Sequence, residues 1–175
     1  YVGWCWKAGN GTVEDGDGTV SCTRSTNTDA GFSIVTWNGN GLENDSFAMP
    51  TGLSDLDLLI VKGRETAGYW SVWHNEFTNG TGLTLNTTDA AKGVGPNSGE
   101  LQTGYAYAIG KGYGPAGNAG SRYKGWFSCT DGGANLNSVN KSGENFTAYC
   151  WHSVEGYSKF GSYVGNGNAN GPFVY

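Results

Sequence analysis

Pairs of asparagine or aspartate with glycine recur along this chain and divide it into short segments. They stand at Asn10-Gly11, Asp15-Gly16-Asp17-Gly18, Asn38-Gly39-Asn40-Gly41, Asn79-Gly80 and Asp131-Gly132-Gly133. Asn-Gly and Asp-Gly pairs readily adopt the positive φ angles that tight hairpin turns require. The segments between them show no sustained 3.6-residue hydrophobic period, which an amphipathic helix would need. The pattern therefore predicts an all-β protein.

The composition agrees with many short strands and narrows the architecture. The chain has 31 glycines among 175 residues, and aromatic residues make up 14% of it. Glycine supplies turns, whereas aromatic side chains fill the half-buried faces of sheets. We expect a lectin-like β-sandwich or jelly roll. The predicted strands are Val2–Lys7, Thr19–Ser25, Phe32–Trp37, Leu56–Lys62, Trp70–Trp73, Gly82–Leu85, Gly104–Ile109, Lys124–Thr130, Phe146–His152, Lys159–Val164 and Gly171–Tyr175.

Charge and hydropathy argue against two classes of partner. The net charge is -5 and the ten basic residues are scattered singly, so there is no basic surface for the phosphates of nucleic acid. The longest apolar stretch, Leu56 to Val61, is far shorter than the ~20 residues of a membrane span. We therefore expect neither nucleic-acid binding nor membrane insertion, and no cofactor. The chain begins with Tyr1, so we expect a processed product or the ordered part of a longer protein.

Two motifs occur twice in the same order. Tyr1-Val-Gly-Trp-Cys-Trp-Lys7 is followed by Phe32-Ser-Ile-Val-Thr-Trp-Asn-Gly-Asn-Gly41. Phe146-Thr-Ala-Tyr-Cys-Trp-His152 is followed by Lys159-Phe-Gly-Ser-Tyr-Val-Gly-Asn-Gly167. Tandem duplication explains this order. It predicts the end of a preceding repeat plus a loop in residues 1–30, a main module in 31–155, and the first strands of a following repeat in 156–175. The alternative is one sandwich whose strands use similar aromatic packing.

Cysteines and acidic residues give no strong signal for a metal site. Cys5, Cys22, Cys129 and Cys150 lack the CxxC spacing of zinc sites, and the sequence leaves three disulfide pairings, or none, open. Asp15 and Asp17 resemble the start of a calcium loop, but no glutamate follows at the spacing of an EF-hand. An acidic turn is the simpler interpretation.

Candidate ligand-binding residues are aromatic. Sugars present flat C–H faces that pack on aromatic rings, so we select the tyrosines of a glycine-rich stretch and two tryptophans as ligand-binding residues: Tyr105, Tyr107, Tyr113, Trp70 and Trp73. Tyrosine among Gly, Asn and Ser is typical of adaptable recognition loops. Asp55 and Asp57 have the spacing of a carboxylate pair for glycoside hydrolysis, but no further signal supports catalysis, and we expect the protein not to be an enzyme.

Five strings of the sequence carry a family resemblance: Gly3-Trp-Cys-Trp-Lys-Ala-Gly9, Gly31 to Gly41, Leu58-Leu-Ile-Val-Lys62, Leu85-Asn-Thr-Thr-Asp-Ala90 and Glu155-Gly-Tyr-Ser-Lys-Phe-Gly-Ser-Tyr163. They resemble an uncharacterised β-rich domain family in structural proteins of tailed bacteriophages, especially marine and cyanobacterial phages. The resemblance covers most of the chain and is weakest from Gly93 to Gly120. It implies a virion component, such as a tail fibre or surface appendage, and no catalytic motif.

Three functions follow as expectations. The first is a structural and adhesive module of a phage appendage on the virion, in contact with other copies of itself, other virion proteins and host-surface polysaccharide. We expect an oligomer, a trimer in the case of a fibre. The alternatives are a stand-alone extracellular carbohydrate-binding domain and, third, a polysaccharide-degrading sandwich enzyme.

Overall fold

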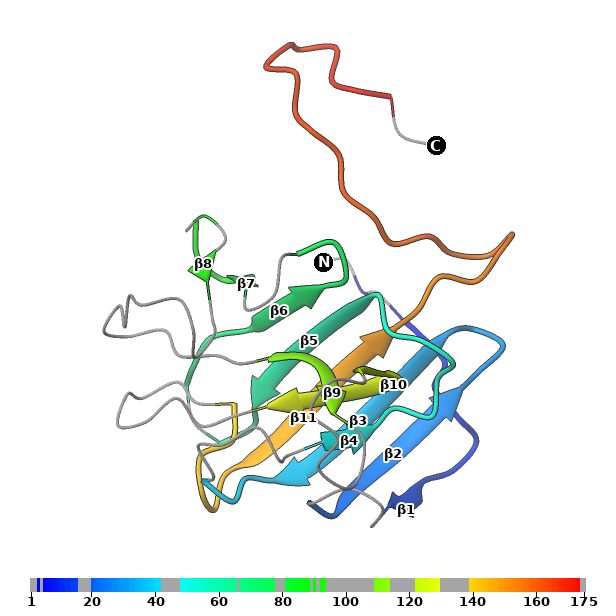
Figure 1. Cartoon of the computed structure of the whole chain (residues 1–175), viewed down its shortest axis with the longest axis vertical. Coiled ribbons are helices and arrows are strands. Elements are labelled where there is room, and N and C mark those ends of the chain that lie inside the picture. Colours follow the sequence, from blue (N-terminus) through cyan, green and yellow to red (C-terminus); the bar gives the residue numbers. More distant parts are fainter. Residues whose placement is uncertain are drawn as a thin grey trace.

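The computed structural model describes residues 3, 5–15, 20–41, 48–65, 67–77, 81–88, 90, 92–93, 109–113, 122–129 and 139–173. This part of the chain is all-β: it contains eleven strands and no helix (Figure 1). The strands are β1 (Val13–Asp15), β2 (Cys22–Asn27), β3 (Phe32–Asn38), β4 (Ala48–Pro50), β5 (Leu58–Gly63), β6 (Ser71–His74), β7 (Thr81–Thr84), β8 (Lys92–Gly93), β9 (Ile109–Tyr113), β10 (Arg122–Cys129) and β11 (Asn145–Trp151).

The larger sheet has eight strands in the order β1-β2-β3-β11-β5-β6-β7-β8, all antiparallel to their neighbours (Figure 1). Consecutive strands are neighbours except at one place. There, β11, the last strand in the sequence, lies between β3 and β5. It pairs along its whole length with β3, and from Phe146 to Trp151 with β5.

The inner face of the larger sheet forms the core. Side chains alternate between the two faces of a strand, so residues paired across strands share a face. Val35, Ala148 and Val61 are paired in one row across β3, β11 and β5, and all three are fully buried. The neighbouring row, Ser33, Cys150 and Leu59, is equally buried.

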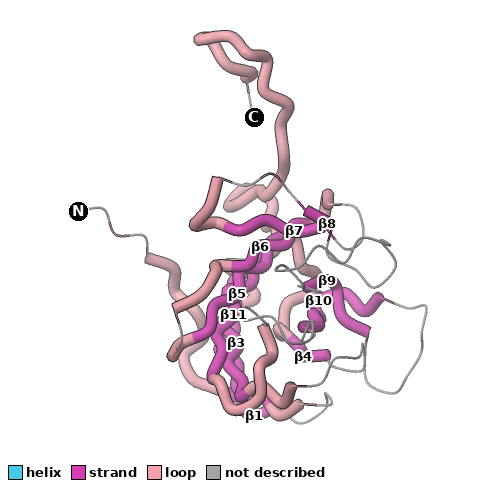
Figure 2. Tube along the Cα trace, turned by 90° about the vertical axis from the view of Figure 1, so that its left-hand side faces the viewer, coloured by secondary structure: helices cyan, strands magenta, loops and turns pink. Residues whose placement is uncertain are grey.

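A smaller sheet, with the order β4-β10-β9, lies on this inner face (Figure 2). Its Met49 and Phe127 belong to the same buried cluster as Val35 and Val61, and the rings of Phe127 and Trp37 meet edge to face with centroids 5.7 Å apart. The large buried apolar side chains thus lie between two layers of strands, which is the arrangement that removes most apolar surface from water.

Thr51 joins the two layers through polar groups. Its carbonyl accepts a 2.6 Å hydrogen bond from the hydroxyl of Thr26 on β2. Its own hydroxyl donates to the carbonyl of Gly125 on β10, at 2.7 Å. Gly125 has a φ of 73°, and a Cβ there would overlap the carbonyl oxygen of Leu53. Glycine is required at this point, where the register of β10 against β9 also shifts as in a β-bulge.

The sequence locates the central strands within a few residues. Phe32–Trp37, Leu56–Lys62, Trp70–Trp73 and Phe146–His152 correspond to β3, β5, β6 and β11. The predicted strand Lys159–Val164 is wrong, because these residues are not in a strand, and neither are the described residues of Val2–Lys7 and Gly171–Tyr175. Strands β1, β4 and β8 were not predicted because each has only two or three residues, too few for a periodic pattern.

The N-terminal residues bear on the repeat interpretation. Strand β2, within the predicted end of a preceding repeat, pairs with β3 from Cys22 to Asn27 and so extends the main sheet. Trp6 also packs on Phe32 and Trp151. The boundaries at residues 30 and 155 stay a prediction.

Phe146 tests the importance of the central strand for stability. Its side chain is 2% exposed and stacks on Trp37 with ring centroids 5.4 Å apart. We expect Phe146→Ala to lower the free energy of unfolding by about 3–5 kcal/mol, because it leaves a cavity in the core. Urea denaturation followed by tryptophan fluorescence measures this change. Leu85→Ala, at a side chain that is 63% exposed, is the control and should change it little. A loss below about 1 kcal/mol for Phe146→Ala would contradict this packing.

Candidate functional site

The outer face of the larger sheet carries a row of apolar and aromatic side chains. Ile34, Tyr149, Ile60, Val72 and Leu83 are paired across β3, β11, β5, β6 and β7. They point away from the core, because their neighbours along the strands point into it. Four of the five are half-buried and Val72 is 9% exposed. An apolar row on the face opposite the core is a candidate contact surface.

Aromatic rings continue this face in both directions from Tyr149. The ring of Trp70 stacks on Tyr149 with centroids 6.4 Å apart and an interplanar angle of 17°. On the other side, the ring of Trp151 lies 6.3 Å from that of Tyr149. We call Trp70, Tyr149 and Trp151 the aromatic ladder.

The two ends of the aromatic ladder differ in exposure. Trp151 is buried, because Trp6, Phe32 and Phe160 pack around its ring with centroids between 5.1 and 6.2 Å away. Trp70 is 36% exposed. Two hydrogen bonds from its backbone to the turn after β7 fix its position. The Trp70 N–H donates to Asn86 Oδ1 at 3.0 Å, and the Trp70 carbonyl accepts from Leu85 N–H at 2.9 Å. The ladder therefore has one covered end and one fixed, open end.

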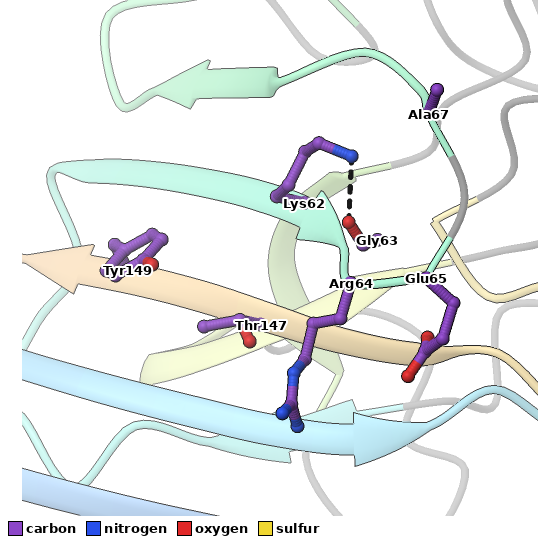
Figure 3. Close-up of a pocket in the computed structure, with 7 residues that line it drawn as sticks. All are labelled: Lys62, Gly63, Arg64, Glu65, Ala67, Thr147 and Tyr149. Carbon is purple, nitrogen blue, oxygen red and sulfur yellow. Dashed lines mark hydrogen bonds between the residues drawn. The ribbon is translucent and has the colours of Figure 1, made fainter.

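An open hollow of about 490 Å³ adjoins Tyr149 on the outer face (Figure 3). Thr147 and Tyr149 of β11 and Lys62 and Gly63 of β5 line it, together with Arg64, Glu65 and Ala67 from the segment that follows β5. Lys62 Nζ donates to the carbonyl of Gly63 at 2.8 Å, and Figure 3 shows its side chain directed toward that segment. The hollow thus combines an aromatic ring, a hydroxyl, two cationic groups and a carboxylate.

Asn145 fixes the segment after β5 in place. Its backbone N–H and its side-chain amide donate to the two carboxylate oxygens of Glu65, each at 2.8 Å. Its carbonyl accepts from Arg64 N–H at 2.8 Å. The two hydrogen bonds from Asn145, first that of its side chain, hold the pKa of Glu65 below its ordinary value of 4.5. Three hydrogen bonds to one residue therefore hold this edge of the hollow.

The predicted ligand-binding residues lie in different environments. Trp70 lies at the open end of the ladder, and its role in ligand binding stays a prediction. Trp73 does not belong in the set: it is 5% exposed and packs in the core, opposite Leu59, because it faces inward on β6. Tyr105 and Tyr107 lie outside the described residues. Tyr113 ends β9, paired with Arg122, and its side chain is not described.

Sequence reasoning missed Tyr149, Thr147, Lys62, Arg64 and Glu65. The alternation of Phe146-Thr-Ala-Tyr-Cys-Trp on one strand was the available signal, because it places Thr147 and Tyr149 on one face. Nothing local in the sequence indicates that this face meets the end of β5.

Asp57 has a structural role at the other end of the sheet. One carboxylate oxygen accepts from the amide of Asn75, after β6, and the other accepts from Ser153 N–H, after β11, at 2.6 Å. Asp55 Oδ1 accepts from Leu56 N–H at 2.8 Å. Asp57 thus connects the ends of three neighbouring strands, so its carboxylate is engaged in the fold. Whether the protein is an enzyme stays a prediction.

The predicted metal and cysteine residues are only partly described. Asp15 ends β1 opposite Cys22, and Asp17 lies outside the described residues. Within the described ranges, no group of three or more His, Cys, Asp or Glu side chains is placed to hold a metal ion. Cys5 is an exposed free thiol and Cys150 a buried one, whose pKa is raised by burial. Cys22 is buried on β2, with β3 between it and β11; the side chain of Cys129, the last residue of β10, is not described.

These features define the class: an all-β domain of two stacked antiparallel sheets with an aromatic outer face. The chain belongs to the family DUF7483, described as a domain of unknown function, which matches residues 1–175. No curated protein and no solved structure matches the chain. Among the residues described, no helix is long and apolar enough to cross a membrane.

The Glu65 carboxylate gives a test of the hollow's geometry by pH. Because its pKa is lowered in the folded protein, the stability that it contributes is present above its ordinary pKa. It is lost as the pH falls through the lower, folded value. We expect carbon-13 NMR titration to place the Glu65 pKa below 4.5 in the native protein, and Asn145→Ala to raise it.

Asn38→Ala is the matched control for this titration. Asn38 donates to Asn145 Oδ1 at 3.3 Å but has no part in the two hydrogen bonds to Glu65. The Glu65 pKa should therefore stay low in this variant. An ordinary Glu65 pKa in the native protein would contradict the described anchor.

Proposed function

We propose that this domain is a β-sandwich module of a bacteriophage tail fibre or surface appendage that contacts host-surface polysaccharide through its outer face. The observation that carries the proposal is the Trp70–Tyr149 stack beside the polar hollow. The resemblance of the sequence to phage structural proteins supports the location on a virion. The two stacked antiparallel sheets support the sandwich architecture.

The outer face offers both contacts that a sugar ring uses. Sugar rings have apolar C–H faces, which pack on aromatic rings, and the nearly parallel rings of Trp70 and Tyr149 offer such faces next to each other. Sugar hydroxyls need donors and acceptors at the rim. Thr147, Lys62, Arg64 and Glu65 supply them around the hollow.

The geometry favours a shallow contact along a chain over the capture of a small molecule. Sites for small ligands are concave and bury most of the ligand surface. The hollow here is open, and the ladder continues beyond it toward Trp151. A polysaccharide can extend from the hollow over Tyr149 and Trp70 and gain affinity from several weak contacts, which repeated copies of the module would multiply.

The remaining properties agree with a rigid, assembled module. The core continues through both sheets, and Thr51 connects them by hydrogen bonds. Copies of such a body can be arranged around or along a fibre, so we propose an oligomer with other copies as partners, a trimer in the case of a fibre. Its location would be the virion surface, outside the cell.

Trp70→Ala tests the polysaccharide contact. Trp70 lies at the open end of the ladder, where truncation removes contact area without opening the core. We expect affinity for a bacterial surface polysaccharide to fall by about tenfold or more, because truncating a tryptophan that contributes strongly to binding commonly costs this much. Binding is measured on an array of surface polysaccharides and then by affinity electrophoresis. Leu85→Ala is the control for loss of an exposed apolar side chain and should bind as the native chain does.

Two results would contradict the proposal in different ways. Failure of the native chain to bind any polysaccharide would remove the adhesive role and leave the structural one. If an antibody against the domain failed to label bacteriophage particles in electron micrographs, the proposed location on the virion would be wrong.

A further inference from the structure

The C-terminal part of the chain leaves the body of the domain. Phe160 packs on Trp151, and Ser162 donates to the carboxylate of Glu76. Beyond Ser162, residues 163–173 extend away from both sheets in the two views (Figures 1 and 2). Tyr163 is 67% exposed, Val164 88% and Phe173 80%. We call residues 156–173 the arm. Its large apolar side chains are unusual on an extended, solvent-facing segment.

The arm repeats features of β3 in both sequence and backbone. Gly31 precedes Phe32 and Ser33, the first residues of β3, as Gly156 precedes Tyr157 and Ser158 of the arm, and Gly-Asn-Gly follows in each case, at residues 39–41 and 165–167. The first glycines have φ angles of 61° and 75°, and the last ones 71° and 66°. Two left-handed glycines thus delimit an aromatic segment in both places.

The environment of the two segments is very different. In β3, Phe32 and Trp37 are buried, and each packs on a ring of the paired strand β11: Phe32 on Trp151, and Trp37 on Phe146. The corresponding Tyr157 and Tyr163 of the arm are exposed. The arm is therefore a β3-like segment that lacks the β11-like neighbour on which burial of its aromatic residues depends.

The N-terminal segment has the sequence of that missing neighbour. Tyr1 to Lys7 matches Phe146 to His152 in the position of its cysteine, its aromatic residues and its final basic residue. Cys5 and Lys7 are exposed and Trp6 is 49% exposed. In its own chain this segment is held at β2, where Asn27 donates to the Lys7 carbonyl, while the arm points elsewhere.

We infer that the arm of one copy pairs as an antiparallel strand with the N-terminal segment of a second copy, reproducing the β3–β11 pairing between molecules. Each copy then offers one arm and one N-terminal segment, so the contact is head-to-tail and joins copies into a closed ring, such as a trimer, or into an open row. Strand addition of this kind gains backbone hydrogen bonds and buries alternate side chains. The inference is independent of the polysaccharide contact.

The β3–β11 register fixes which residues should meet. Cys150 is paired with Ser33. Cys5 corresponds to Cys150, whereas Ser33 corresponds to Ser158 counted from Gly31 and to Lys159 counted from the Gly-Asn-Gly end. Cys5 of one copy should therefore lie opposite Ser158 or Lys159 of the next. Directly paired residues have Cβ atoms ~5 Å apart, close enough for a disulfide after a small adjustment.

Mixed disulfides between two different chains test this contact. One chain carries Cys5→Ser with either Ser158→Cys or Lys159→Cys, and the other is the native chain with its exposed Cys5. Because the first chain has no Cys5, a disulfide between the two sites can form only between molecules. We expect mild oxidation to give a reducible heterodimer for one of the two arm positions, with the linked peptides identified by mass spectrometry.

The matched control is Cys5→Ser with Asn168→Cys. Asn168 is on the arm and exposed, as Lys159 is, but it lies beyond Gly167 and so outside the paired stretch. It should give little heterodimer. The inference would be overturned if neither Ser158→Cys nor Lys159→Cys gave a heterodimer. It would also be overturned if Asn168→Cys gave as much heterodimer, because the disulfide would then form by random collision and not from a fixed strand register.

Discussion

The pairing of β11 with β3 on one side and β5 on the other is the interaction on which the rest of the structure depends. It brings the end of the folded sequence into the middle of the larger sheet. Phe146, Ala148 and Cys150 thereby fill the centre of the core between side chains of β3 and β5. Long-range strand pairing carries a loop-closure cost, which this burial of apolar surface must offset. Asp57 and Asn145 reinforce the two ends of the β11–β5 pair by hydrogen bonds.

The same strand determines the outer face, because side chains alternate along it. Thr147 and Tyr149 face outward between the core residues of β11, so the packing of the core also fixes the position of the aromatic ladder. The hollow forms where this face meets the segment after β5, and Glu65 holds that segment to Asn145. A surface held by the core in this way loses little conformational entropy when it binds, which suits the proposed adhesive role with its many weak contacts.

Much of this could be predicted from the sequence, and the failures have physical reasons. Strand β11 was predictable from the alternation of residue types along its own sequence. Its position between β3 and β5 was not, because the sequence of a strand does not determine by itself which strands it pairs with. Trp70 was found as an aromatic candidate, whereas Trp73 was misplaced because the sequence does not tell which face of β6 meets the core. The hollow could not be predicted, because Lys62 and Tyr149 come together only through the pairing of β5 with β11. Lys159–Val164 has a strand-like sequence without a strand, since a strand needs a neighbour as well as a pattern.

Hydrogen exchange of individual backbone amides is the most direct measurement of the central role of β11. The backbone amides of a buried strand that is paired on both sides exchange only when a large part of the structure opens. The account predicts that the amides of Thr147 to Trp151 are among the slowest in the protein, together with their partners on β3 and β5. The amides of residues 163–173, in an isolated copy, should exchange fastest. Fast exchange along β11, with protection retained in β2, β3, β5 and β6, would contradict the account.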